Sequence, residues 1–149
     1  MTDVAFYHLQ RSPLEKVLPK LLEKTLAAGR RALVRTGSAE RAEALATTLW
    51  TYDPGGWLPH GTAEDGNPAD QPIWLTDSDE NANGAAFLFL TDGASSDQLA
   101  QFERGFDLFD GNDPAAVAAA RERWKVWKAA GHVLTYWQQS ETGAWERKG

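Results

Sequence analysis

The chain has 149 residues, a length typical of one domain and too short for two of ordinary size. Hydrophobic residues make up 42% of it and charged residues 24%, which excludes a disordered or fibrous protein. Cysteine is absent, so disulfides, thiolate nucleophiles and cysteine-ligated metal centres are excluded. We find no signal-length apolar run at the N-terminus and no segment near the roughly 20 apolar residues of a membrane-spanning helix, so we expect a cytoplasmic protein without a membrane partner.

Charge is unevenly distributed along the sequence. The net charge is −6, and the section from Trp50 to Asp110 carries twelve acidic residues against one arginine. Between Arg121 and Lys128, by contrast, four basic residues stand against one acidic residue. An acidic protein with one short basic segment suits a small anionic partner better than a long polyanion such as duplex DNA. A solvent-exposed helix face is the simpler alternative for the basic segment.

Strand-like and helix-like segments alternate in the first fifty residues. Residues 4–9 (VAFYHL) and 31–36 (RALVRT) are apolar runs typical of strands. Residues 12–15 (SPLE) resemble a capping box and predict a helix over the leucines that follow. Ser38 is expected to cap a second helix that runs to about Trp50. This alternation predicts βαβ units and a parallel sheet.

The remainder of the chain begins with a long polar segment, residues 53–72. A loop of this length in a compact domain is typically functional or mobile. Further strands are expected at residues 73–76, 85–90 and 105–109, a short helix near 97–102, a last helix over 113–130 and an extended segment over 132–138. We find no linker and no repeat, so the sequence predicts one α/β domain over residues 1–149 with a mostly parallel sheet.

Common catalytic and nucleotide-binding motifs are missing from the sequence. It has no Gly-rich phosphate loop ending in Gly-Lys-Ser/Thr, no G-x-G-x-x-G after the first strand and no G-x-S-x-G elbow. His8, His60 and His132 are scattered, and none lies three or four residues from another. We therefore expect no metal site, no cofactor and no catalytic residue. His60, in L-P-H-G, is interpreted as a residue that anchors its loop by hydrogen bonds.

Tryptophan is unusually frequent, with seven residues. Trp50, Trp57 and Trp127 occupy positions where a surface or rim location is expected. Aromatic side chains and arginine dominate binding hot spots because they bury a large area at low entropic cost. Core packing is the alternative for each tryptophan taken alone.

The last predicted helix combines an apolar stripe with a row of cations. At 100° per residue, the stripe contains Val117, Ala120, Trp124 and Trp127. The cations along one edge of it are Arg121, Lys125 and Lys128. Cations beside an aromatic surface suit a short acidic peptide that ends in an apolar side chain and a carboxylate. The alternative is a basic helix rim whose alkyl stems cover the core.

Five short segments together form a specific pattern along essentially the whole chain. They are F-Y-H-L at 6–9, L-W-T-Y at 49–52, W-L-P-H-G at 57–61, Q-P-I at 71–73 and A-A-R-E-R-W-K at 119–125. In order and spacing they resemble the chi subunit of bacterial DNA polymerase III. The resemblance implies a Rossmann-like three-layer α/β/α fold and a non-catalytic accessory subunit of a DNA-directed DNA polymerase, within its clamp-loader assembly.

The same resemblance implies two protein partners. The first is the acidic, phenylalanine-terminated C-terminal tail of the single-stranded DNA-binding protein, so that contact with DNA is indirect. The residues assigned to the tail are Trp50, Phe109, Arg121, Trp124, Lys125 and Lys128. The second partner is the psi subunit, which tethers chi to the clamp loader, and Trp57 matches an aromatic position at that interface. Two residues depart from the family pattern, since Trp124 stands where a tyrosine is familiar and Trp57 where a phenylalanine is familiar.

A different class of function is a small Rossmann-like enzyme that acts on a nucleotide or sugar. In this alternative, residues 53–72 would form a lid. The missing phosphate-binding glycines and the absence of a nucleophile–base pair in the sequence speak against it.

Overall fold

The computed structural model describes residues 2–53 and 58–149. Within these residues, seven strands form one sheet in the order β3-β2-β4-β5-β1-β6-β7. Every neighbouring pair is parallel except β6 and β7, which are antiparallel. In chain order the elements are β1 (Asp3–Leu9), α1 (Leu14–Ala27), β2 (Ala32–Arg35), α2 (Ala39–Thr51), β3 (Ile73–Thr76), β4 (Phe87–Leu90), β5 (Arg104–Asp110), α3 (Pro114–Ala129), β6 (Val133–Gln139) and β7 (Trp145–Arg147).

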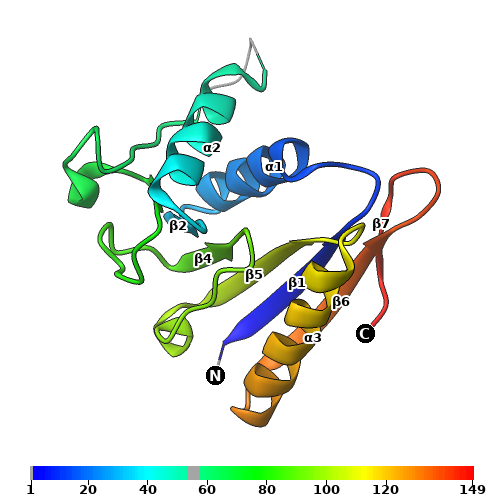
Figure 1. Ribbon diagram of the computed structural model, residues 1–149. Coiled ribbons are helices and arrows are strands. Elements are labelled where there is room, and N and C mark those ends of the chain that lie inside the picture. The colour runs from blue at the N-terminus through cyan, green and yellow to red at the C-terminus, as the bar shows by residue number, and fades with distance from the viewer. Residues whose placement is uncertain (1, 54–57) are drawn as a thin grey trace.

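The helices cover both faces of the sheet. Figure 1 shows α1 and α2 together on one side, while α3 lies alone on the other side against β1, β5 and β6. Alternation along β5 explains the division, because Phe106 and Leu108 join the core under α1 and α2 whereas Phe109 joins the core under α3. The prediction of an α/β fold with a mostly parallel sheet is therefore confirmed.

Helix starts were predicted with mixed success. The Ser38 hydroxyl accepts a hydrogen bond from the Arg41 N–H at 3.1 Å and caps α2, as predicted. The capping box at residues 12–15 is wrong, because Pro13 occupies the N-cap position of α1 and no side chain caps that helix. The Ser12 hydroxyl instead accepts a hydrogen bond at 3.1 Å from the side-chain amide of Gln139, the last residue of β6.

Two other segments differ from their predicted form. The stretch near residues 97–102 contains only a short 3-10 helix, Leu99–Gln101. The described part of the 53–72 segment is partly ordered against the sheet, since Gly61 forms a bridge with Trp74 and a 3-10 helix spans Pro68–Asp70. The edge strand β7 was not predicted from the sequence.

A buried ion pair joins α3 to the centre of the sheet. The Arg123 guanidinium donates to Asp107 from Nε at 2.6 Å and from Nη2 at 3.0 Å, and the two side chains are only 10% and 2% exposed. Burial raises the pKa of Asp107, while the hydrogen bonds and charge of Arg123 oppose this rise. Removing one partner would leave a buried charge without compensation.

We predict that Arg123→Ala lowers the free energy of unfolding by about 3–5 kcal/mol at neutral pH. The loss should shrink as the pH falls, because protonation of Asp107 removes the uncompensated charge. Urea unfolding at several pH values measures both effects. Arg121→Ala, on the exposed side of the same helix, is the matched control and should change the free energy by less than about 0.5 kcal/mol. Equal stability of the two variants would contradict this role for the ion pair.

Candidate functional site

A cavity of about 340 Å³ lies between α3 and the strands that α3 covers. We call it the α3 pocket. Its walls come from α3 and from three adjacent strands, β5, β1 and β6. The lining residues are Phe6, Phe109, Val117, Ala120, Arg121, Trp124, Lys125 and Tyr136.

The inner wall of the α3 pocket is aromatic. The Phe6 ring packs edge-on against Trp124 with the ring centres 5.1 Å apart, and against Phe109 at 6.5 Å. Tyr136 lies beside Phe6 in the β1–β6 register and packs edge-on against Trp124 at 6.2 Å. Parallel pairing thus brings rings from distant parts of the sequence to one place, where each is held by its neighbours.

The outer rim of the α3 pocket is positively charged. Arg121 and Lys125 lie one helical turn apart on α3, and both are exposed. Lys125 pairs with Glu122 at 3.2 Å, but both side chains are well exposed, so this ion pair is weak. Another anion can therefore replace Glu122 as the partner of Lys125. Burial raises the pKa of Tyr136, and the nearby Arg121 charge opposes the rise. The pocket therefore offers an apolar interior beneath two cations.

The structure brings together four of the residues that the sequence assigned to the tail site. These are Phe109, Arg121, Trp124 and Lys125, all of which line the α3 pocket. Lys128 is exposed in the last turn of α3 and does not line it. Trp57 lies outside the described residues. Phe6 and Tyr136 were missed, because only the strand register shows that they share a face with Phe109.

The prediction that Trp50 belongs to the tail site is wrong. Trp50 belongs to α2, which covers the opposite face of the sheet, and its side chain is 64% exposed. Its ring packs against His60, with the ring centres 4.8 Å apart. Trp50 therefore belongs to a separate surface.

His60 supports that surface from beneath. The side chain is buried, and its Nδ1 and Nε2 lie 2.7 Å and 3.0 Å from the carbonyl oxygens of Leu58 and Ala46. These contacts tie the segment after α2 back to the helix. The interpretation of His60 as an anchoring residue is confirmed.

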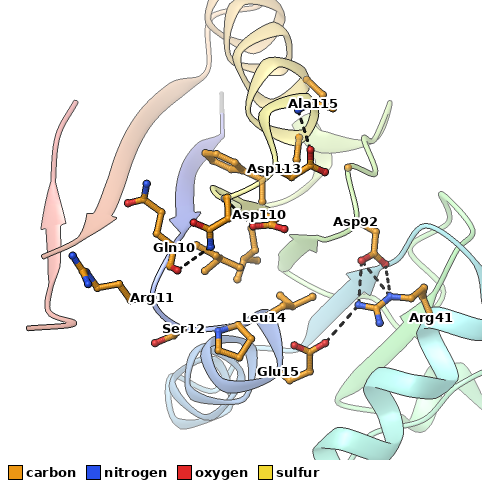
Figure 2. A pocket seen from close by; sticks show the side chains of 18 of the residues that line it. Gln10, Arg11, Ser12, Leu14, Glu15, Arg41, Asp92, Asp110, Asp113 and Ala115 are labelled. Atoms are coloured by element: carbon orange, nitrogen blue, oxygen red, sulfur yellow. Dashed lines mark hydrogen bonds and ion pairs between the residues drawn. The ribbon is translucent and has the colours of Figure 1, made fainter. Parts of the chain in front are cut away.

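A larger cavity, of about 800 Å³, lies at the carboxyl ends of β1 and β5, between the first turns of α1 and α3. Figure 2 shows Arg41 between Asp92 and Glu15, at 3.2 Å and 3.8 Å respectively. Acidic side chains outnumber arginines in the lining, and both Arg41 and Arg123 already bind carboxylates. These features disfavour a phosphate or nucleotide. The described part of the 53–72 segment lines neither cavity, so a lid over this cleft has no support.

Other kinds of site were also sought over residues 2–53 and 58–149. No group of three or more histidine or acidic side chains there could hold a metal ion. In the same part of the chain, no helix combines the length and apolar character needed to cross a membrane.

Comparison with known proteins agrees with the pattern of short segments in the sequence. The family model described as DNA polymerase III chi subunit, HolC, matches residues 1–135. The chain belongs to this family. The probable DNA polymerase III subunit chi of Rickettsia prowazekii (strain Madrid E) is 28% identical over 109 residues, which cover 73% of this chain and 66% of that protein. Membership of the chi family is consistent with an accessory role in DNA replication. The region matched by the family model ends one residue before Tyr136.

Tryptophans of this chi-family chain differ sharply in their surroundings. Trp127 is only 5% exposed and packs against Phe6 with the ring centres 5.5 Å apart, so its predicted surface or rim location is wrong. It faces the sheet because it lies on the apolar stripe of α3, one turn after Trp124. Trp50, in contrast, is largely exposed.

We predict that Trp127→Ala lowers the free energy of unfolding by about 3–5 kcal/mol, as expected when a large core side chain is removed. Trp50→Ala should change it by less than about 0.5 kcal/mol. Thermal and urea unfolding of the two variants provide the comparison. Comparable destabilisation by both substitutions would mean that Trp50 is a core residue and not part of an exposed surface.

Proposed function

We propose that this protein is a non-catalytic accessory subunit of the DNA polymerase III holoenzyme that links the polymerase to the C-terminal tail of single-stranded DNA-binding protein. The α3 pocket is the observation that carries this proposal. It combines an aromatic interior with two exposed cations in one small cavity. Those are the two features that an acidic peptide with a terminal phenylalanine requires.

The pocket and such a tail are complementary group by group. The terminal phenyl ring fits among Phe6, Phe109 and Trp124, where it gains edge-on contacts and loses its hydration. Carboxylates of the tail fit Arg121 and Lys125, where the hydrogen bonds are charge-assisted. A short flexible peptide loses conformational entropy when it binds, so we expect micromolar affinity, about −8 kcal/mol.

The acidic character of the rest of the protein supports indirect contact with DNA. With a net charge of −6, the chain repels a naked phosphate backbone over most of its length. A partner that already coats the strand removes this difficulty, because only its acidic tail has to reach the α3 pocket. The cations on α3 are thus sufficient for a local peptide contact.

A second surface on the other face of the sheet is assigned to the psi subunit and, through it, to the clamp loader. Trp50 presents a large exposed ring at the end of α2, supported by the buried His60. Trp57, which the sequence resemblance assigns to psi, lies seven residues further along the same segment. Exposed aromatic anchors of this kind supply much of the energy of protein interfaces. We therefore place Trp50 with Trp57 and not with the tail site.

Arg121→Ala should weaken binding of an acidic, Phe-terminated peptide by ~1.5–3 kcal/mol, the value of a hydrogen bond to a charged group. Isothermal titration with the peptide at low salt measures the change. Amidation of the terminal carboxylate and added salt should also weaken binding, because exposed charges contribute to it.

Lys128→Ala is the matched control for that experiment, since it removes a cation from the same helix without touching the cavity. It should reduce affinity by no more than about twofold, through long-range attraction alone. If Arg121→Ala and Lys128→Ala weaken the peptide equally, the pocket is not where the tail binds. Absence of any heat with the unaltered protein would reject the proposed function itself.

Trp50→Ala should leave peptide affinity unchanged and abolish co-elution with the psi subunit. The two sites lie on opposite faces of the sheet, so their effects should be independent. Size-exclusion chromatography with purified psi, together with the peptide titration, tests both statements. Loss of peptide binding with retention of psi would reverse the assignment of the two surfaces.

A further inference from the structure

We propose that His8 is a positioning residue of the α3 pocket, which sets the direction of the Tyr136 hydroxyl proton and makes affinity for an anionic peptide increase as the pH falls. This inference rests on the proposed function of the pocket. His8 does not line the cavity itself. It lies behind the cavity wall and acts through Tyr136.

The side chain of His8 is fixed between two residues of that wall. It is 7% exposed, and its Nδ1 forms a hydrogen bond with the Tyr136 hydroxyl. Its ring packs against Phe109 with the ring centres 5.1 Å apart and edge-on against Tyr136 at 5.8 Å. A change in the protonation of His8 is therefore transmitted directly to a residue that lines the pocket.

The other ring nitrogen determines how the neutral ring is arranged. Nε2 is buried beside Gly111, where an added Cβ would lie 2.1 Å from it, and it has no hydrogen-bond partner among the described residues. The Gly111 backbone raises the pKa of His8, and from its position beside Nε2 we infer that the neutral ring carries its proton on Nε2. With the proton on Nε2, Nδ1 is an acceptor, and the Tyr136 hydroxyl must donate to it. The hydroxyl then presents only lone pairs to the pocket, which disfavours a carboxylate.

Protonation of His8 reverses this arrangement. Nδ1–H becomes the donor and the Tyr136 oxygen becomes the acceptor. The hydroxyl of Tyr136 keeps its proton, which now points toward the pocket. The ring also gains a positive charge close to Arg121. Both changes favour an anion at the rim, one by a hydrogen bond and one by charge.

Charged and titratable groups on each neighbouring element set the range in which this occurs. Burial is the largest cause that lowers the pKa of His8, and Arg121 on α3 adds to it. The Gly111 backbone and Asp110 at the end of β5 oppose the shift, and Tyr136 contacts the ring from β6. A carboxylate bound at Arg121 offsets the repulsion between Arg121 and a charged His8. The pKa of His8 therefore rises on binding, and affinity must increase as the pH falls through that pKa.

Titration with the acidic, Phe-terminated peptide at pH 5.5, 6.5 and 7.5 tests the inference. We expect tighter binding at pH 5.5 than at pH 7.5, by at most about three- to tenfold. That limit corresponds to a rise of about half to one unit in the pKa of His8 on binding, and it is approached as the pH falls below the pKa of the free protein. The lower limit keeps the carboxylates of the peptide ionised, since their ordinary pKa is near 4.

Three variants separate His8 from other sources of pH dependence. His8→Gln should lose the gain in affinity between pH 7.5 and pH 5.5, because glutamine cannot be protonated. Tyr136→Phe should keep only part of that gain, because His8 still becomes charged near Arg121 but no hydroxyl proton can turn toward the pocket. The chain has three histidines, and His132→Gln, which alters one outside the pocket, is the matched control that should keep the full increase. An increase that survives in His8→Gln would overturn the inference.

Proton NMR of the unaltered protein gives the same answer if a variant fails to fold. The ring signals of His8, titrated with and without peptide, should show a higher pKa in the complex. If the peptide binds but the pKa of His8 does not change, the inference is wrong and the proposed function stands. If no peptide binds at any pH, the proposed function is wrong, and the inference falls with it.

Discussion

The buried ion pair between Asp107 and Arg123 is the constraint on which the arrangement around α3 depends. It holds the helix at the centre of the sheet with two hydrogen bonds between side chains that are almost fully buried. Since side chains two residues apart on a helix point in different directions, fixing Arg123 inward leaves Arg121 exposed at the rim of the α3 pocket. The basic segment therefore contains two kinds of arginine, one that holds the helix in place and one that is available to a ligand.

Three adjacent parallel strands then supply the interior of the pocket. Phe109, Phe6 and Tyr136 belong to β5, β1 and β6, and they meet because pairing aligns their α3-facing positions. An aromatic interior under exposed cations is selective for a ligand that is both apolar and anionic. The excess of negative charge elsewhere limits the size of that ligand to a short segment. The same wall places His8 where its protonation affects the ligand in two ways, through the Tyr136 hydroxyl and through a positive charge near Arg121.

Local patterns in the sequence predicted the elements well, and interactions between distant residues account for most of the errors. Apolar runs and turn residues located β1 to β6 and the three helices, and the helical stripe placed Trp124 beside Arg121. The predicted capping box is absent, and Ser12 instead binds Gln139 of β6. Tyr136 was missed because local periodicity does not determine the register between strands. Trp50 was assigned to the wrong surface because sequence does not show which face of the sheet a helix covers. The Rossmann-like description of the fold stays a prediction.

Two-dimensional NMR of isotope-labelled protein, titrated with the acidic, Phe-terminated peptide, is the most direct measurement of the central claim that the α3 pocket binds the tail. The indole signal of Trp124 and the backbone amides of Arg121 and Lys125 should shift progressively, while the indole of Trp50 should not. Shifts concentrated at Trp50, or around Arg41 and Asp92 in the larger cleft, would contradict the account.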